Sequence, residues 1–442
     1  MHNLAIALKN KGNQVSGSDD EIFEPSLGRL KESGLLPDAA GWNKERIKGD
    51  LDAIILGMHA KADNPELIEA RRLGIPVYSF PEFLYEQTRN KTRVVISGSH
   101  GKTTITSMVM HVLKQEGILF DYLVGAKLEG FDVMVGMNEK ANIAVFEGDE
   151  YLTSPLDPRP KFHLYHPDIA LVTGIAWDHY NVFPTFENYL EQFMIFVRSI
   201  EKGGIYIYYE GDKNAIDLLP FLPVGVTAVP YREVPFDIQN GDYFLVYDQK
   251  RYPLDLFGLH NIQNIAGAWK ICGQLGVSDE AFLNAIATFR GASRRLEKVY
   301  ESKESTVYWD FAHAPSKVRA TVEAVRQKYP ERRLVACLEL HTYSSLSKDF
   351  LTNYGSSMHG ADIAAVYFNP HAIALKGLKM LDFEDVRQAF AHSDLHVFND
   401  SKVMQQFLKG LSWTGTNLLM MSSGDFDGIK VRDFSASLLK GK

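Results

Sequence analysis

The feature that most constrains how this chain folds is a short glycine-containing loop between a strand-like run and a helix-like run. Thr92–Ser97 has the apolar, β-branched character of a strand, and Gly98-Ser99-His100-Gly101-Lys102-Thr103-Thr104 follows it directly. A strand, a tight turn and a helix start aim several backbone N–H groups at one point, where the helix dipole favours negative charge. The segment therefore predicts an α/β unit with a polyphosphate site. The helix places its apolar residues on one face, at Ile105, Met108, Val109, Val112 and Leu113.

Two residues of this loop carry chemistry that a plain turn does not need. Lys102 reaches the terminal phosphates of a bound nucleotide and the Thr103 hydroxyl ligates magnesium, so ATP and Mg²⁺ are the predicted cofactors. The spacing is shorter than the full GxxxxGK[ST] pattern, because Ile96 stands where the first glycine would be. The structural alternative is a tight turn with a chance Gly-Lys-Thr sequence. The strand before the loop and the amphipathic helix after it favour the phosphate site.

Length and composition exclude several other classes of protein. A chain of 442 residues is about three times the size of a typical domain, so two or three cores are expected. The net charge of −8 gives no general attraction to polyphosphate, so nucleic acid is not an expected partner. Cys272 and Cys337 are too few for a disulfide framework or a cysteine-rich zinc site. No run reaches the roughly 18 apolar residues of a membrane helix and no leader opens the chain, so we expect a cytoplasmic protein without membrane insertion.

Alternating strand-like and helix-like segments divide the chain into three regions, residues 1–88, 89–290 and 291–442. The alternation predicts α/β folding with parallel sheets, and the last region is a second doubly wound pattern. Gly204–Tyr209 and Asp242–Tyr247 are expected to form an antiparallel side sheet. The other expected strands are Asn13–Ser18, Leu51–Leu56, Ile75–Tyr78, Thr92–Ser97, Asn142–Phe146, Ile169–Ile175, Thr306–Phe311, Leu334–Leu338, Ile363–Tyr367, Leu395–Phe398 and Leu418–Met421. The expected helices include Met1–Lys11, Pro65–Leu73, Lys317–Lys328 and Phe383–Ala391.

The start of the chain differs from that of an ordinary nucleotide-binding domain. Such a domain opens with a strand and a glycine-rich turn, whereas Met1–Lys11 already has the apolar rhythm of a helix. We therefore expect the sequence to begin inside a longer natural chain, the alternative being an unusual first domain.

Polar groups that suit a metal ion follow two more of the predicted strands. Glu147-Gly148-Asp149-Glu150-Tyr151 comes after one strand, and Asp178-His179 comes shortly after another. Ligands bind at the carboxyl ends of parallel strands, so Thr103, Glu147 and His179 are expected to converge on one edge. A hydroxyl, a carboxylate and an imidazole beside ATP suit magnesium. The structural alternatives are a solvated acidic loop and a hydrogen-bonded loop histidine.

With these residues in view, the sequence resembles the Mur ligase family, the bacterial enzymes that build the peptide of peptidoglycan. The resemblance covers nearly the whole chain, and seven motifs occur in the family's order. They are Gly98–Thr104, Glu147–Tyr151, Asp178-His179, His260–Asn264, Arg294–Glu297, Asp310–Pro315 and Met421–Gly424. The resemblance implies three domains: a Rossmann-like domain for a UDP-sugar, a central P-loop ATPase domain with a mostly parallel sheet, and a C-terminal Rossmann-like domain that closes over ATP and binds the incoming amine.

The resemblance also implies roles for individual residues. Lys102 and Thr103 hold ATP phosphates and magnesium, Glu147 is a magnesium ligand and His179 binds a second magnesium. The catalytic candidates are Lys102, Glu147, His179 and Arg295, and the nucleotide candidates beyond the loop are His260, Asn261, Asn264, Arg295 and Asp310. The substrate-binding candidates are Ser18, Asp19, His59, Asp149, Glu150, His313, His341 and Tyr343. Without the resemblance, the amides after His260 would equally suit a helix start, and Arg294-Arg295 would be a solvated pair.

Within the family, the chain resembles the branch whose acceptor is UDP-N-acetylmuramate. One member of that branch adds L-alanine, and another reattaches the recycled tripeptide L-alanyl-γ-D-glutamyl-diaminopimelate. Glu147–Tyr151, Asp157–Pro167 and Ser422–Ile429 look closer to the tripeptide enzyme, whereas His341-Thr342-Tyr343 looks like the alanine enzyme. Phe193 stands near the position where several relatives carry a modified lysine, which this branch generally lacks. We expect the tripeptide as substrate in peptidoglycan recycling, with L-alanine as the alternative.

The chemistry implied by the resemblance is amide formation through an acyl phosphate, made by transfer of the ATP γ-phosphoryl group. The amine must lose a proton before it attacks, and Asp149, Glu150 and His179 are the candidate acceptors. An alternative of another class is an ATP-binding module or P-loop ATPase without ligation. Phosphate release in the absence of any amine would favour that class.

Overall fold

The computed structural model describes residues 1–439, and the chain folds into two compact units. The first unit holds the predicted phosphate loop, and the second holds the last region. The first consists of Met1–Ile175, Leu190–Arg232 and Gly267–Phe282, and the second of Ala176–Tyr189, Glu233–Ala266 and Leu283–Lys442.

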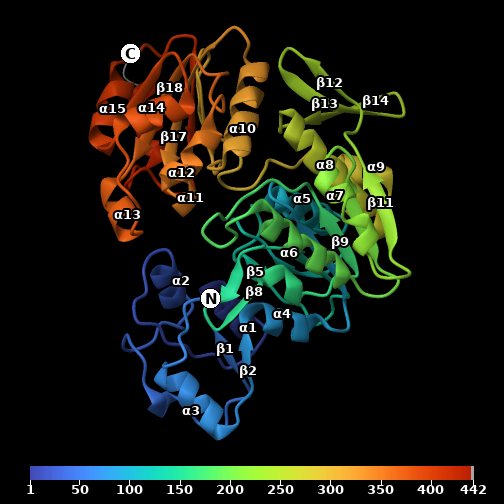
Figure 1. Cartoon of the computed structure of the whole chain (residues 1–442). Coiled ribbons are helices and arrows are strands. Elements are labelled where there is room, and N and C mark those ends of the chain that lie inside the picture. The colour runs from blue at the N-terminus through green and yellow to red at the C-terminus, as the bar shows by residue number, and fades with distance from the viewer. Residues whose placement is uncertain (440–442) are drawn as a thin grey trace. The chain divides into compact units, whose positions relative to one another are not determined.

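A seven-stranded sheet forms the core of the first unit (Figure 1). Val94, Val95 and Ile96 of its central strand are fully buried, as expected for a continuous apolar run covered on both faces. Every neighbouring pair is parallel except the last, between β4 and β5. The order is β11 (Thr227–Tyr231), β10 (Ile205–Tyr209), β9 (Ile169–Val172), β3 (Thr92–Ser97), β6 (Ile143–Glu147), β4 (Phe120–Leu123) and β5 (Val135–Gly136).

The helix after the phosphate loop packs on this sheet. Helix α5 (Lys102–Gln115) contacts β3 and β6, and all five residues of its predicted apolar face are fully buried. Other helices in the middle of the chain are α6 (Phe186–Arg198), α7 (Lys213–Ile216), α8 (Leu259–Gln274) and α9 (Asp279–Ile286), with 3₁₀ turns at Lys161–Leu164 and Leu219–Phe221.

The N-terminal part of the first unit contains a two-stranded parallel sheet and four helices. The Asn64 side chain caps the helix that begins at Pro65, accepting from the N–H groups of Glu66 and Leu67, and Gly74 ends it in a left-handed conformation. The elements are α1 (His2–Asn10), α2 (Ser26–Glu32), a 3₁₀ turn (Lys44–Arg46), β1 (Ile54–Leu56), α3 (Pro65–Leu73), β2 (Val77–Ser79) and α4 (Phe80–Thr88).

A six-stranded sheet forms the core of the second unit. All its pairs are parallel except β15 with β16. Helix α10 packs on β17 and β20, and α15 packs on β18 and β19. The strand order is β15 (Glu297–Glu301), β16 (Thr306–Asp310), β20 (Thr416–Met421), β17 (Arg333–Leu340), β18 (Ile363–Phe368) and β19 (Leu395–Phe398). The helices are α10 (Pro315–Lys328), α11 (Tyr343–Leu346), α12 (Lys348–Leu351), a 3₁₀ turn (Thr352–Tyr354), α13 (Pro370–Leu375), α14 (Phe383–Phe390), α15 (Ser401–Gly410) and α16 (Val431–Leu439).

Two small antiparallel sheets complete the fold. The sheet in the second unit consists of β12 (Phe236–Gln239), β13 (Asp242–Tyr247) and β14 (Lys250–Leu254). The sheet in the first unit consists of β7 (Leu152–Ser154) and β8 (Asp157–Pro160).

The α/β class with mostly parallel sheets is confirmed, but two of the strand predictions are wrong. Gly204–Tyr209 was expected beside Asp242–Tyr247 in an antiparallel sheet, whereas β10 pairs in parallel with β9 and β11 of the main sheet. Asn13–Ser18 forms no strand. The predicted domain boundaries after residues 88 and 290 stay predictions.

None of the helices within residues 1–439 combines the length and the apolar composition that crossing a membrane requires.

Candidate functional site

The phosphate loop is fixed against the end of strand β9. Gly98 has a φ of 121°, and a Cβ at this position would lie 2.1 Å from Thr173 Oγ1 and 2.8 Å from the Thr173 nitrogen. Only glycine fits such a backbone without strain. The Ser99 N–H donates to the Gly174 carbonyl at 2.9 Å, and Thr173 Oγ1 donates to the His100 carbonyl at 2.5 Å. These bonds join the loop to the segment that follows β9.

Helix α5 begins with the residue expected to meet the phosphates. Gly101 precedes it with a φ of 76°, and Thr104 is buried in the first turn. The Lys102 ammonium donates to the Gly98 carbonyl at 2.6 Å and lies 2.7 Å from a Glu150 oxygen. Burial alone would lower the pKa of Lys102, but the Glu150 carboxylate and its acidic neighbours outweigh burial and raise it. Lys102 therefore stays positively charged.

Two of the predicted magnesium ligands lie side by side in the first unit. Thr103 Oγ1 donates to Glu147 Oε1 at 2.8 Å, and the Gly125 N–H donates to Glu147 Oε2 at 2.6 Å. A hydroxyl and a carboxylate are the hard oxygen donors that magnesium prefers, so the residues present fit the metal. The third predicted ligand, His179, belongs to the second unit, and the three-residue site stays a prediction.

The other acidic residues after β6 have different partners. Asp149 pairs with Lys161, with 2.6 Å between Oδ2 and Nζ, and its other oxygen accepts the Tyr151 N–H at 3.1 Å. Glu150 is fully buried, whereas the Asp149 side chain is 37% exposed. The two neighbouring carboxylates therefore differ in both environment and partner.

The segment that carries His179 is anchored within the second unit. Asp178 Oδ1 accepts the His179 N–H at 2.8 Å, and Asp178 Oδ2 pairs with Lys317 at 3.3 Å. Burial would raise the pKa of Asp178, but Lys317 and the nearby histidines outweigh burial and hold it well below its usual range. Trp177 Nε1 donates to the Phe183 carbonyl at 2.9 Å, which closes the turn.

Asp310 and Arg295, predicted to contact ribose and phosphates respectively, both lie near the start of the last region. One Asp310 oxygen accepts the Leu296 N–H and the other accepts the Ala312 N–H at 2.7 Å. Burial raises the pKa of Asp310, against the lowering effect of Arg295. The Arg295 guanidinium lies 4.7 Å from the centre of the Phe311 ring. Asp310 therefore links the backbone just before β15 to the backbone just after β16.

The predicted adenine-side residues lie at the start of α8. Asn261 Nδ2 donates to the Phe257 carbonyl at 2.9 Å, and Asn264 Nδ2 donates to Asn261 Oδ1 at 3.4 Å. Burial lowers the pKa of His260 to about 4, so the ring is neutral near pH 7. The amides stabilise the helix start, as the structural alternative predicts, and their contact with adenine stays a prediction.

Three of the predicted substrate residues lie near the ends of strands or helices in the second unit. His313 Nδ1 lies 2.9 Å from the Phe311 carbonyl, and burial lowers the pKa of this ring to about 4. His341 follows β17, with Nδ1 3.6 Å from Glu339 Oε1. Tyr343 begins α11 and is 37% exposed. The side chains of His341 and Tyr343 are thus accessible to a ligand.

The predicted residues of the N-terminal part include one that is engaged structurally. Ser18 Oγ donates to Glu66 of helix α3. Asp19 Oδ1 accepts the Asp20 N–H at 3.0 Å, and burial together with Asp20 raises the pKa of Asp19, while His59 lowers it. The expected roles of Asp19 and His59 in substrate binding stay predictions.

Sequence reasoning missed a hollow of about 470 Å³ in the first unit. It lies at the carboxyl ends of β1 and β2, beside the β7–β8 hairpin. Arg159 of this hairpin forms ion pairs with Glu82 of α4 at 3.2 Å and with Asp157 at 2.7 Å. The charged pair two residues apart in Asp157–Arg159 was the signal available. The lining residues are Leu56, Arg71, Val77, Ser79, Glu82, Ser154, Leu156, Asp157 and Arg159.

Sequence reasoning also missed a buried carboxylate in the second unit. Glu339 lies in the apolar strand β17, accepts the Ser422 hydroxyl, and accepts the Phe426 N–H at 2.8 Å. A Cβ at Gly424 would lie 2.7 Å from His341 Nδ1 and 2.9 Å from Glu339 Oε2, so any larger residue there would displace one of these side chains. A charged residue within an otherwise apolar strand was the available signal.

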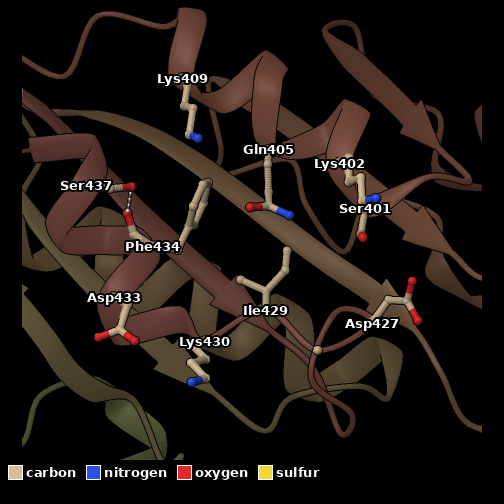
Figure 2. Close-up of a pocket in the computed structure, with 11 residues that line it drawn as sticks. Ser401, Lys402, Gln405, Lys409, Asp427, Ile429, Lys430, Asp433, Phe434 and Ser437 are labelled. Carbon is tan, nitrogen blue, oxygen red and sulfur yellow. Dashed lines mark hydrogen bonds between the residues drawn. The ribbon is translucent and has the colours of Figure 1, made fainter.

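A second hollow, of about 400 Å³, lies between α15 and α16 of the second unit (Figure 2). Side chains of both helices and of the preceding loop reach into it, with three lysines and two aspartates among them. None of the predicted catalytic, nucleotide-binding, substrate-binding or metal-binding residues lines it, although Asp427, Gly428 and Ile429 belong to the segment Ser422–Ile429 that looks closer to the tripeptide enzyme. The lining residues are Ser401, Lys402, Gln405, Lys409, Asp427, Gly428, Ile429, Lys430, Asp433, Phe434 and Ser437.

Comparison with known proteins agrees with this arrangement. Three family descriptions match consecutive parts of the chain: Mur ligase family, catalytic domain, over residues 1–92; Mur ligase middle domain, over residues 96–272; and Mur ligase, glutamate ligase domain, over residues 294–424. The UDP-N-acetylmuramate–L-alanine ligase of Caldicellulosiruptor bescii is 31% identical over 380 residues, which cover 82% of this chain and 80% of that protein.

Solved structures show the same fold. The UDP-N-acetylmuramate–alanine ligase of Thermotoga maritima has a TM-score of 0.70 at 19% identity, covering 100% of this chain and 97% of that one. A murein peptide ligase of Psychrobacter arcticus has a TM-score of 0.67 at 22% identity, covering 99% of this chain and 96% of that one. The glycine-bounded loop, the lysine and threonine that open α5, and these similarities together show that the chain belongs to the Mur ligase family of ATP-dependent amide-bond ligases.

Proposed function

We propose that this ligase joins the carboxylate of UDP-N-acetylmuramate to the amine of L-alanine. The observation that carries the ATP-dependent chemistry is the placement of Lys102 and Thr103 at the start of α5, with Thr103 bonded to Glu147 at 2.8 Å. The amine substrate is supported by similarity to UDP-N-acetylmuramate–L-alanine ligases. This similarity favours L-alanine over the recycled tripeptide that the sequence motifs favour.

The proposed roles follow from the chemistry of the acceptor. A carboxylate is a poor acylating agent, so the γ-phosphoryl group of ATP converts it to an acyl phosphate with a good leaving group. Lys102 neutralises charge on the terminal phosphates, and Thr103 and Glu147 hold Mg²⁺. A magnesium ion held by Thr103 and Glu147 would supply positive charge that offsets the negative charge of the phosphates. The protein's part is therefore to position the reactants and stabilise charge.

The proposed division of the chain assigns the sugar nucleotide to residues 1–88, ATP to residues 89–290 and the amine to residues 291–442. The three family matches, which begin and end near these limits, support it. We place the reaction in the cytoplasm, where ATP and sugar nucleotides are made.

A second candidate amine is the tripeptide L-alanyl-γ-D-glutamyl-diaminopimelate. It is supported by the likeness of Asp157–Pro167 to the tripeptide enzymes, and part of that segment forms strand β8 beside the hollow in the first unit. The murein peptide ligase fold is also among the similar structures.

The test is release of phosphate from ATP with UDP-N-acetylmuramate and either L-alanine or the tripeptide, with the product identified by mass spectrometry. We expect product with L-alanine. Product with the tripeptide alone would replace the proposed amine and keep the ligase chemistry. Phosphate release without any amine would favour a plain ATPase, and a Lys102→Ala variant provides the background for each reaction.

A further inference from the structure

Lys102 of the phosphate loop is already held by a buried carboxylate. Its ammonium lies 2.7 Å from Glu150 Oε2 and 3.0 Å from Glu150 Oε1, within the first unit. The Glu150 side chain is fully buried and that of Lys102 is 13% exposed. Water therefore screens this ion pair poorly, and the attraction is stronger than it would be at the surface.

The pair is specific among the acidic residues that follow β6. Thr103 bonds to Glu147 at 2.8 Å and Lys161 pairs with Asp149 at 2.6 Å, so each of these two carboxylates has another partner. Glu150 is the acidic residue that engages the lysine expected to bind phosphate. A lysine ammonium has three donors, and the Gly98 carbonyl takes one of them at 2.6 Å.

We propose that Glu150 competes with the terminal phosphates of ATP for Lys102 and so sets the affinity of the loop for nucleotide; this rests on the proposed ATP-dependent function. Lys102 must exchange at least part of its contact with Glu150 for phosphate oxygens when ATP binds. The Glu150 charge then lies close to the triphosphate and repels it. Glu150 is thus a positioning residue that acts through Lys102, rather than the group that takes the proton of the amine.

Neutralising Glu150 while keeping its shape tests the proposal directly. The Glu150→Gln variant should bind a non-hydrolysable ATP analogue with magnesium about tenfold more tightly than the unchanged protein, because Lys102 then gives up a weaker contact with a neutral amide and no carboxylate charge repels the phosphates. Calorimetric titration measures this without any turnover. AMP, which lacks the β- and γ-phosphates, should bind both proteins equally.

Asp121→Asn provides the matched control. Asp121 is also buried in the first unit and pairs with Lys91 at 2.6 Å, so its replacement removes a comparable ion pair away from the loop. We expect this variant to lose thermal stability, as Glu150→Gln does, with an unchanged affinity for the ATP analogue. An equal gain in affinity in both variants would overturn the proposal, because the gain would then come from a general loss of stability and not from the contact between Glu150 and Lys102.

A double-mutant cycle shows whether the effect passes through Lys102. Lys102→Met should weaken binding of the analogue, and adding Glu150→Gln to it should give much less than the tenfold gain. Unchanged or weaker binding by folded Glu150→Gln would overturn the proposal, and a lower ligation rate with unchanged affinity would make Glu150 the proton acceptor instead.

Two further measurements keep the outcome clear. If Glu150→Gln does not fold, Glu150→Asp keeps the charge on a shorter side chain that draws the carboxylate back from Lys102, and it should show a smaller gain of the same sign. No gain in Glu150→Asp would overturn the proposal in that case. Failure of the unchanged protein to bind the analogue would instead contradict the proposed ATP-dependent function itself.

Discussion

Asp178 and Lys317, 139 residues apart in the sequence, form an ion pair with 3.3 Å between Oδ2 and Nζ. Asp178 immediately precedes His179 and accepts its N–H at 2.8 Å, so the pair fixes the backbone that presents this histidine. Lys317 lies in the first turn of α10. Lys317 of α10 therefore positions a histidine of the same unit.

Replacing Lys317 by methionine should destabilise the protein and disturb the histidine. Asp178 would then be a buried charge without this partner, and we expect the free energy of unfolding to fall by about 2–4 kcal/mol. This loss is smaller than for a fully buried pair, because the Lys317 side chain is 24% exposed and water screens part of the attraction. Urea unfolding measures the loss. Since His179 is a proposed magnesium ligand, the magnesium concentration for half-maximal ligation should also rise.

Lys298→Met is the matched control for this prediction. Lys298 pairs with Glu301 at 2.7 Å, but both side chains are about half exposed, so its loss should change stability by at most about 1 kcal/mol. Adding Asp178→Asn to Lys317→Met should recover much of the stability. Equal effects of the two lysine variants would contradict the assigned role of the buried pair.

Gly98→Ala should damage the phosphate loop more than a glycine replacement elsewhere. The added Cβ would lie 2.1 Å from Thr173 Oγ1, so the loop must move away from the strand end that holds it. Gly117 has a φ of 68° and no atom within 4 Å of such a Cβ, so Gly117→Ala isolates the backbone strain, about 1–2 kcal/mol. Gly98→Ala should lower the free energy of unfolding by about 1–3 kcal/mol more than Gly117→Ala does. It should also bind the ATP analogue poorly, whereas Gly117→Ala should bind it normally.

Much of the fold was predictable because local signals agree with the packing. The helix Pro65–Leu73 was predicted to the residue, since asparagine caps its start and Gly74 ends it. Strand β3 was likewise predicted in full. The error at β10 has a physical cause, because its mixture of isoleucine and tyrosine is typical of either kind of sheet and the choice depends on distant partners, β9 and β11.

The candidate site was predictable as a set of residues but not as a set of contacts. Lys102 and Glu150 are 48 residues apart, and their pairing depends on how β3 and β6 lie side by side in the sheet. The sequence marks Asp149 and Glu150 as equivalent neighbours, and only the backbone path decides that one faces Lys161 and the other Lys102. The same holds for Glu339, whose partners Ser422 and Phe426 follow a strand predicted from its apolar residues alone.

Acidification should weaken the fold through histidines that are buried as neutral rings. Burial lowers the pKa of His163 to about 4, and its Nε2 lies 2.8 Å from the Gln192 carbonyl. In the unfolded chain His163 takes up a proton near pH 6.5, whereas in the folded chain it stays neutral until about pH 4. The stability that comes from burying the neutral ring is therefore present above about pH 6.5 and is lost as the pH falls toward 4. His260 and His313 act in the same direction.

His163→Phe separates this contribution from the rest. The ring of His163 stacks on Phe162 at 4.8 Å, so phenylalanine keeps the stacking and removes the titration. The variant loses a hydrogen bond and should be less stable at pH 7.5, but its unfolding free energy should fall less between pH 7 and pH 4.5. Parallel pH profiles for the two proteins would show that His163 does not titrate as a buried neutral ring.

Lys102→Ala should abolish ligation and also destabilise the fold, and a second substitution should separate the two effects. Loss of the ammonium removes charge neutralisation from the phosphates, which we expect to lower the ligation rate by at least about a hundredfold. It also leaves Glu150 buried without this partner, at a cost of about 3–5 kcal/mol. Adding Glu150→Gln should restore most of the stability, measured by urea unfolding, and none of the ligation. Near-normal turnover in folded Lys102→Ala would contradict the proposed mechanism, and recovery of turnover in the double variant would show that the lysine serves the fold alone.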